Sequence, residues 1–119
     1  MSDREVISEG RRLKTSTKEL EGAALDWAVA QCVGVDVSGT DRPMYSPSSN
    51  WLHCGELIDR YLMLVDVFED GTEAKAVIPD GPEFGRHYTV IASPTRVAIC
   101  QAVVGAHYGD TVDVPESLL

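Results

Sequence analysis

The sequence predicts one α+β domain, a layered α/β/α-type sandwich in which a small antiparallel sheet of about three strands packs with three helices. Three segments have helical periodicity, and two of them are apolar around so much of their circumference that other elements must cover them. Short runs of aliphatic and β-branched residues, separated by turn residues, lie between the second and third helices and are typical of antiparallel strands. The chain of 119 residues suffices for one core, which we place in residues 11–119, and the polar residues 1–10 are predicted to be a frayed extension.

The first helix is expected at residues 16–34, and the rest of the chain must fit around it. Ser16 followed by Glu19 is a capping box, which satisfies free backbone donors at a helix start. Gly34 is placed to end the helix, because glycine adopts the left-handed conformation at low cost. Two sides of this helix carry the apolar residues: Leu20, Ala24 and Trp27, with Gln31, on one side, and Leu25, Val29 and Cys32 on the other. These two sides predict a core helix.

The remaining elements follow in order along the chain. The second helix is expected from an N-cap at Ser48 or Ser49 to about Tyr61. Ser93 as N-cap, with Pro94 in the first helical position, predicts the start of the last helix. The extended segments are an edge strand at 11–15, sheet strands at 62–68, 73–78 and 87–92 with a hairpin turn at 69–72, and an extended tail at 111–115.

Charge and cysteine content exclude several classes of protein. The net charge of −9 argues against a nucleic-acid partner, because neutralising phosphates requires clustered lysine and arginine. Cys32, Cys54 and Cys100 are odd in number, far apart and each within a predicted helix, which indicates buried reduced thiols rather than a disulfide framework or a zinc site. No apolar run approaches the length of a membrane span, and the N-terminus lacks the apolar core of a signal peptide. We therefore expect a cytoplasmic protein without a membrane partner.

The loop at residues 44–51 is the best candidate for a binding site. Hydroxyl and amide groups, two aromatic rings and a helix N-terminus can together bind and stack a polar ligand. The residues that offer these groups are Tyr45, Ser46, Ser48, Ser49, Asn50 and Trp51. The alternative interpretation is an N-cap loop whose aromatic rings fill the core beneath it.

Two further groups complete the candidate site. Asp26, next to Trp27, is an ionisable residue in a nearly apolar helix, where it can accept hydrogen bonds from a ligand. Alternatively, Asp26 lies on a solvent-facing stripe or caps a neighbouring loop. Thr95 and Arg96 combine backbone donors with a guanidinium in the first turn of the last helix, which suits a phosphate but also suits water. We expect Asp26, the serine-rich loop and the start of the last helix to surround one hollow.

Catalytic and cofactor motifs are absent from the sequence. It contains no Gly-x-Ser-x-Gly nucleophile motif, no P-loop, no dinucleotide fingerprint and no histidine pair at metal-ligand spacing. His53, His87 and His107 are isolated from one another. We therefore predict a protein that is not an enzyme and that uses no cofactor and no metal.

Three blocks resemble the NinX-type small proteins of tailed phages and their prophages: LEGAALDWAVA at 20–30, YSPSSNW at 45–51 and GDTVDVPE at 109–116. The pairing of Tyr45 and Ser46 with SPTRVAICQA at 93–102 is similar to the phage αβα-sandwich domain. The resemblance covers most of residues 12–116. It implies a phage or prophage origin, a compact sandwich and a location in the cytoplasm of an infected or lysogenic bacterium, but no settled activity.

The leading functional hypothesis is a non-enzymatic phage accessory protein that binds and sequesters a small polar ligand, with nucleotide-derived host signals as candidates. This role is an analogy with other small phage proteins that sequester nucleotide immune signals. The alternative is a protein-interaction module that binds and inhibits a host protein through Tyr45, Trp51 and the acidic surface. A homodimer or higher homo-oligomer is compatible with either function, because the apolar helices can exceed what one small sheet covers.

Overall fold

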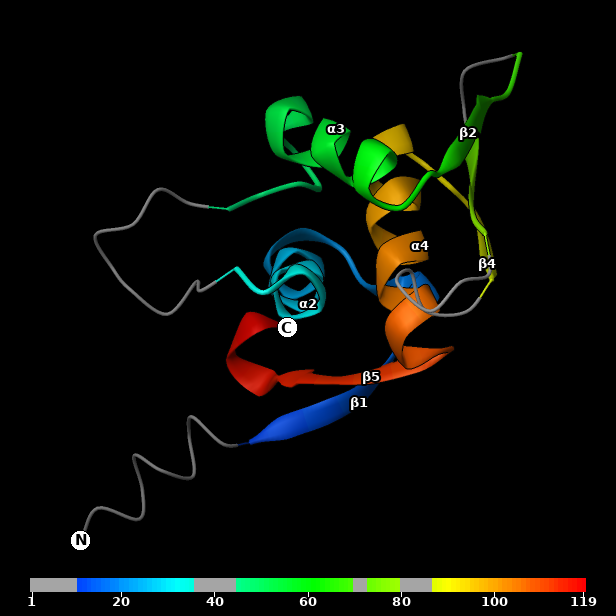
Figure 1. Cartoon of the computed structure of the whole chain (residues 1–119). Helices are drawn as coiled ribbons and strands as arrows, with labels where there is room; N and C mark the ends of the chain where they lie inside the picture. The colour runs from blue at the N-terminus through cyan, green and yellow to red at the C-terminus, as the bar shows by residue number, and fades with distance from the viewer. Residues whose placement is uncertain (1–10, 36–44, 70–72, 80–86) are drawn as a thin grey trace, which may run out of the picture.

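The computed structural model describes residues 11–35, 45–69, 73–79 and 87–119 (Figure 1). The elements in chain order are β1 (Arg12–Ser16), η1 (Thr17–Glu19), α2 (Gly22–Val33), α3 (Trp51–Arg60), β2 (Leu64–Val67), β3 (Ala74–Ile78), β4 (Tyr88–Ala92), α4 (Thr95–Tyr108), β5 (Thr111–Pro115) and η2 (Glu116–Leu118). Three helices and a three-stranded antiparallel sheet in these ranges confirm the predicted α+β fold class. The predicted extension at 1–10 and the turn residues 70–72 lie outside the described residues. No helix within the described ranges is long and apolar enough to cross a membrane.

Helix α4 occupies the middle of the fold. Its residues from 98 to 106 are all buried, so other elements must cover it on every side. The three-stranded sheet covers one side of α4, and helices α2 and α3 cover the other (Figure 1). The expected central sheet is therefore an outer layer, because α2 and α3 pack on α4.

The sheet packs on α4 through small side chains at one end of β3 and larger ones elsewhere. Strand β3 lies between β2 and β4 and is antiparallel to both. Ala74, Ala76, Ile78 and Val90 are buried in this sheet. At the far end of α4, a Cβ on Gly105 would overlap the ring of Tyr88. The glycine therefore allows the helix and the strand to approach.

Replacing Gly105 by alanine is expected to lower the free energy of unfolding by about 1 kcal/mol. Overpacking costs about 1–3 kcal/mol, which exceeds the gain in helix propensity of about 1 kcal/mol. The Tyr88 ring cannot move freely, since its hydroxyl donates to Oδ1 of Asp110 over 2.8 Å. Gly55→Ala in α3 is the matched control, because its Cβ would meet no atom within 4 Å, and it is expected to stabilise. Urea denaturation measures both variants, and equal stabilisation of both would contradict the close contact.

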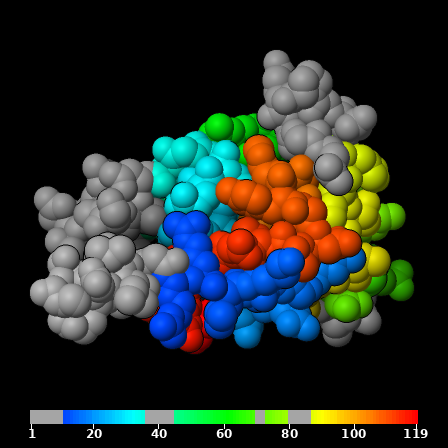
Figure 2. All heavy atoms as spheres, turned by 90° about the horizontal axis from the view of Figure 1, so that it is seen from below, coloured from blue at the N-terminus to red at the C-terminus, as the bar shows by residue number. Residues whose placement is uncertain are grey.

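The predicted edge strand and the predicted extended tail pair with each other. Strands β1 and β5 form a second, two-stranded antiparallel sheet, with Lys14 opposite Asp113. Thr17, directly after β1, is fully buried, and its Oγ1 donates to the carbonyl of Gly109 over 2.6 Å. This ribbon of β1 and β5 lies beside α2 and the end of α4 (Figure 2).

The predicted start of the first helix is wrong. Helix α2 begins at Gly22, and Ser16 precedes the 3-10 turn η1 without a side-chain capping bond. The reason is a tertiary contact: Nε2 of Gln101 in α4 donates to the carbonyls of Lys18 and Leu20, at 3.3 and 2.8 Å. These bonds hold the segment against α4 in a form other than an α-helix. The predicted end is confirmed, since Gly34 is the C-cap with a φ of 80°.

The other two helix starts are each shifted by one or two residues from the prediction. The N-cap of α3 is Asn50, whose Oδ1 accepts from the backbone N–H of Leu52 over 2.9 Å. Ser48 and Ser49 are therefore not the cap, because their backbone belongs to the preceding turn. In α4 the N-cap is Pro94 rather than Ser93, and the helix begins at Thr95.

Candidate functional site

Asp26 connects helix α2 to the loop before α3 by a hydrogen bond. Its Oδ1 accepts a hydrogen bond from the backbone N–H of Ser48 over 2.8 Å. Burial raises the pKa of Asp26 above its ordinary value, although the bonds from Ser48 and the charge of His53 oppose this shift. This geometry matches the interpretation in which Asp26 caps a neighbouring loop.

The polar groups of the loop also bond to one another. The N–H of Ser46 donates to Nδ1 of His53 over 3.1 Å, and the Tyr45 ring lies 5.1 Å from the His53 ring between centroids. The Ser46 carbonyl accepts from the N–H groups of Ser49 and Asn50, at 3.0 and 2.9 Å. His53, in the first turn of α3, therefore bonds to the preceding loop through a backbone group of Ser46. No sequence pattern identifies this partner.

Trp51 and Arg96 connect this loop to the start of α4. The Arg96 guanidinium carbon lies 5.2 Å from the centroid of the Trp51 ring, which is cation–π geometry. Trp51 is 49% exposed, and Nε of Arg96 is buried without a hydrogen-bond partner among the described residues. Thr95 is the first residue of the same helix. The structure thus brings together the three predicted regions, and their groups largely satisfy one another.

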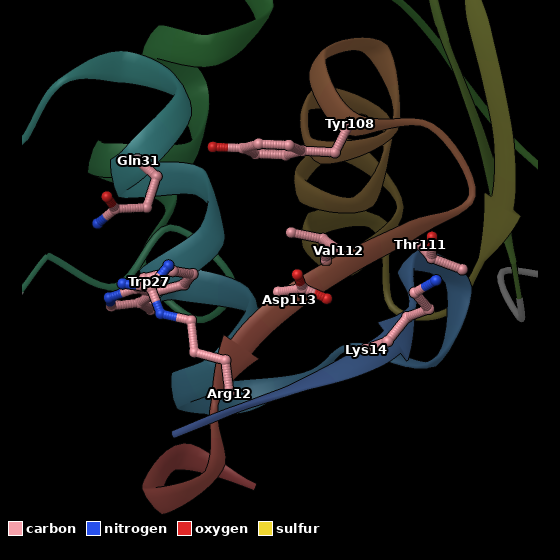
Figure 3. Close-up of a pocket in the computed structure, with 8 residues that line it drawn as sticks. All are labelled: Arg12, Lys14, Trp27, Gln31, Tyr108, Thr111, Val112 and Asp113. Atoms are coloured by element: carbon pink, nitrogen blue, oxygen red, sulfur yellow. The ribbon is translucent and has the colours of Figure 1, made fainter. Parts of the chain in front are cut away.

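A pocket of about 360 Å³ lies elsewhere, between helix α2, the end of α4 and the ribbon of β1 and β5 (Figure 3). We call it the ribbon pocket. The residues that line it are Arg12, Lys14, Trp27, Gln31, Tyr108, Thr111, Val112 and Asp113. Among the predicted binding residues, only Trp27 belongs to this lining.

Each side of the ribbon pocket supplies a different kind of group. Trp27 and Gln31 are four residues apart on α2 and so share a face of that helix. Tyr108, the last residue of α4, extends toward Gln31 (Figure 3). Arg12 and Lys14 alternate along β1, which places both on the same face of the ribbon.

The electrostatics of the ribbon pocket differ from those of the whole chain. The chain has a net charge of −9, whereas the pocket lining has two cations, Arg12 and Lys14, and one carboxylate, Asp113. The Arg12 guanidinium carbon lies 5.0 Å from the centroid of the Trp27 ring. Burial raises the pKa of Tyr108, so that its hydroxyl stays neutral at physiological pH and can donate a hydrogen bond. The pocket can therefore bind an anion that also has a flat apolar face.

Sequence reasoning missed most of the pocket because it did not predict the ribbon. The alternation of Arg12 with Lys14, and of Thr111 with Asp113, was a usable signal for two-faced strands. The missing information was that these two strands, about a hundred residues apart, pair with each other.

Fold and pocket together define an α+β protein with a ligand-sized pocket. No protein-family model matches this sequence, and no curated protein matches it. Within the ranges that the structure describes, no three histidine, cysteine, aspartate or glutamate side chains gather so that they could hold a metal ion.

Proposed function

We propose that this protein binds and sequesters a small planar anion of the nucleotide class in the ribbon pocket, without chemical turnover. The observation that carries the proposal is the combination of two cations and two aromatic rings around one pocket of about 360 Å³. This volume falls within the range of about 300–1,000 Å³ for small-molecule sites.

The lining groups match the parts of such a ligand. The rings of Trp27 and Tyr108 offer stacking surfaces for a base. Arg12 and Lys14 offer charge-assisted hydrogen bonds to a phosphate. Gln31 and the remaining polar lining residues can bond to ribose hydroxyls or to a base edge.

The chemistry of the lining supports the proposal of binding without turnover. The lining contains no histidine, which is the commonest proton shuttle near neutral pH, and neither cysteine nor serine as a nucleophile. A protein that binds a signal tightly and leaves it intact lowers the free concentration of that signal. The resemblance to NinX-type phage proteins makes a bacterial host the proposed setting and its cytoplasm the proposed location.

A thermal-shift titration tests the proposal with nucleoside monophosphates, cyclic nucleotides and ADP-ribose as probes. At a ligand concentration 100 times its Kd, binding stabilises the folded state by about 2.7 kcal/mol, a shift of several degrees in Tm. Arg12→Gln and Tyr108→Ala are expected to weaken binding at least about tenfold, or about 1.4 kcal/mol. Lys75→Gln is the matched control, because it removes one positive charge from an exposed side chain of β3, which does not line the pocket.

Two outcomes would contradict this function. The first is that none of the nucleotides raises Tm at millimolar concentration. The second is that Lys75→Gln weakens binding as much as Arg12→Gln does, which would indicate nonspecific attraction. The alternative function is a module that binds a host protein. It is supported by two neighbouring exposed apolar side chains in α3, Trp51, which is 49% exposed, and Leu52, which is 75% exposed. A Leu52→Ser variant separates the two functions, since it should bind nucleotide normally and lose only a host protein captured through α3.

A further inference from the structure

The polar side chains that line the ribbon pocket are not bonded to one another. Within the described residues, none of them makes a side-chain hydrogen bond or an ion pair: Arg12, Lys14, Gln31, Tyr108, Thr111 and Asp113. In the loop before α3, by contrast, the polar groups bond to one another. The donors and acceptors of the ribbon pocket therefore remain available to a ligand.

Asp113 supplies a carboxylate to this lining, and its neighbours on the ribbon are cations. In the register of β1 and β5 it lies directly opposite Lys14, so the two side chains share a face. Arg12 is two residues from Lys14 and is the diagonal neighbour of Asp113 on that face. In the described part of the chain, neither cation forms an ion pair with Asp113. Both carboxylate oxygens are therefore free to accept hydrogen bonds.

This carboxylate restricts which anions the pocket can accept. It repels a phosphate placed next to it, so the part of the ligand that faces Asp113 must carry hydrogen-bond donors. Arg12 lies over the ring of Trp27 and beside Asp113 on the ribbon, which places the carboxylate near the edge of that ring. Figure 3 shows Asp113 at the same opening as Trp27 and Tyr108. A base that stacks on Trp27 therefore presents its edge to Asp113.

Guanine is the base whose edge matches a carboxylate. Its N1–H and its 2-amino group are adjacent donors, which can bond to both oxygens of one carboxylate at once. Adenine and cytosine have a ring acceptor next to their exocyclic amine, and uracil has a carbonyl oxygen on each side of its N–H. A carboxylate repels each of these acceptors.

We propose that the ribbon pocket selects guanine nucleotides, with Asp113 as the specificity-determining residue that accepts hydrogen bonds from N1–H and the 2-amino group of the base. This inference rests on the proposed function, because it requires a nucleotide in the same pocket. Gln31, on helix α2, can donate to O6 of the base, and Arg12 and Lys14 bind the phosphate.

Calorimetric titration of the full-length protein tests the selectivity with a series of nucleoside monophosphates. Guanosine monophosphate (GMP) should bind at least about tenfold more tightly than adenosine monophosphate (AMP), because a bidentate pair discriminates between bases by about this factor or more. Inosine monophosphate keeps N1–H but lacks the 2-amino group, so its affinity should lie between these two. 2′-Deoxy-GMP should bind as tightly as GMP, since the proposed contact is to the base and not to the ribose.

Asp113→Asn is the sharper test, because it should change the preferred base instead of only weakening binding. The asparagine amide offers one acceptor and one donor, which match the N1–H and the C2 carbonyl of xanthine. The variant should therefore bind xanthosine monophosphate at least about tenfold more tightly than GMP, the reverse of the wild-type order. Asp66→Asn is the matched control: it removes the same charge from an exposed side chain of β2 outside the pocket, and it should keep the preference for GMP.

The failure of this inference differs from the failure of the proposed function. Equal affinities for GMP and AMP, both weakened by Arg12→Gln, would overturn the guanine preference and leave nucleotide binding in the pocket. Much weaker binding of 2′-deoxy-GMP than of GMP would also overturn it, because Asp113 would then bind the ribose hydroxyls. An Asp113→Asn variant that still prefers GMP would remove Asp113 from base recognition. If none of the nucleotides binds, the proposed function and this inference are both wrong.

Discussion

Replacing Asp26 by alanine is expected to lower the free energy of unfolding by about 1–3 kcal/mol, because the buried N–H of Ser48 then has no acceptor. The same change releases the loop before α3, since the bond of 2.8 Å between Ser48 and Asp26 joins it to α2. Asp26→Asn should behave differently. Its amide oxygen can accept the same bond without placing a charge in a partly buried site. We therefore expect the asparagine variant to be at least as stable as the wild type at pH 7.

The pH dependence of stability distinguishes the effect of the Ser48–Asp26 hydrogen bond from that of the Asp26 charge. Burial raises the pKa of Asp26 above its ordinary value of 3.8, so the folded state holds this proton more tightly than the unfolded state does. The contribution of Asp26 to stability is therefore largest below 3.8 and declines as the pH rises through the folded-state pKa. The stability of Asp26→Asn relative to the wild type should accordingly increase between pH 4 and pH 7. Urea denaturation at several pH values measures this difference. An asparagine variant as unstable as the alanine variant at pH 7 would mean that the charge itself is required.

The helices and the three-stranded sheet were predictable because their signals are local. Gly34 ends α2 through its own backbone preference, and the apolar periodicity of residues 93–108 identifies α4. The start of α2 was not predictable from the same kind of signal. The capping residues Ser16 and Glu19 fit a helix, but the bonds from Gln101 to this segment stabilise a different backbone.

In the candidate sites, too, local sequence signals predicted some features, whereas other features depend on tertiary contacts. Asp26, Ser48, Trp51 and Arg96 were predicted to lie together, and the structure joins them in two contacting pairs. The ribbon pocket needed the pairing of β1 with β5, which no local pattern specifies. The sequence identified Trp27 as an aromatic residue next to Asp26. In the fold, Trp27 instead lines the ribbon pocket, together with residues of β1 and β5.

Replacing Gln101 by glutamate is expected to destabilise the protein by about 3 kcal/mol or more at pH 7, a larger effect than that of Asp26→Ala or Gly105→Ala. Gln101 is 3% exposed, and its Nε2 donates to the carbonyls of Lys18 and Leu20. A carboxylate in its place would put a buried negative charge against two carbonyl oxygens. Both the loss of the two bonds and the unpaired charge oppose folding.

The same substitution should make stability strongly dependent on pH. Burial and the facing carbonyls raise the folded-state pKa of a carboxyl at position 101, so the stability of Gln101→Glu is greatest below the unfolded-state pKa and falls as the pH rises toward the folded-state pKa. In its protonated form the carboxyl can still donate one bond to Leu20. Gln101→Leu is the control: it loses both donors, but it also removes Oε1, which is buried and has no partner among the described residues. We expect it to lose about 1–3 kcal/mol with no added dependence on pH. A glutamate variant with the same pH profile as the leucine variant would show that water reaches position 101 and that a carboxylate there is not desolvated.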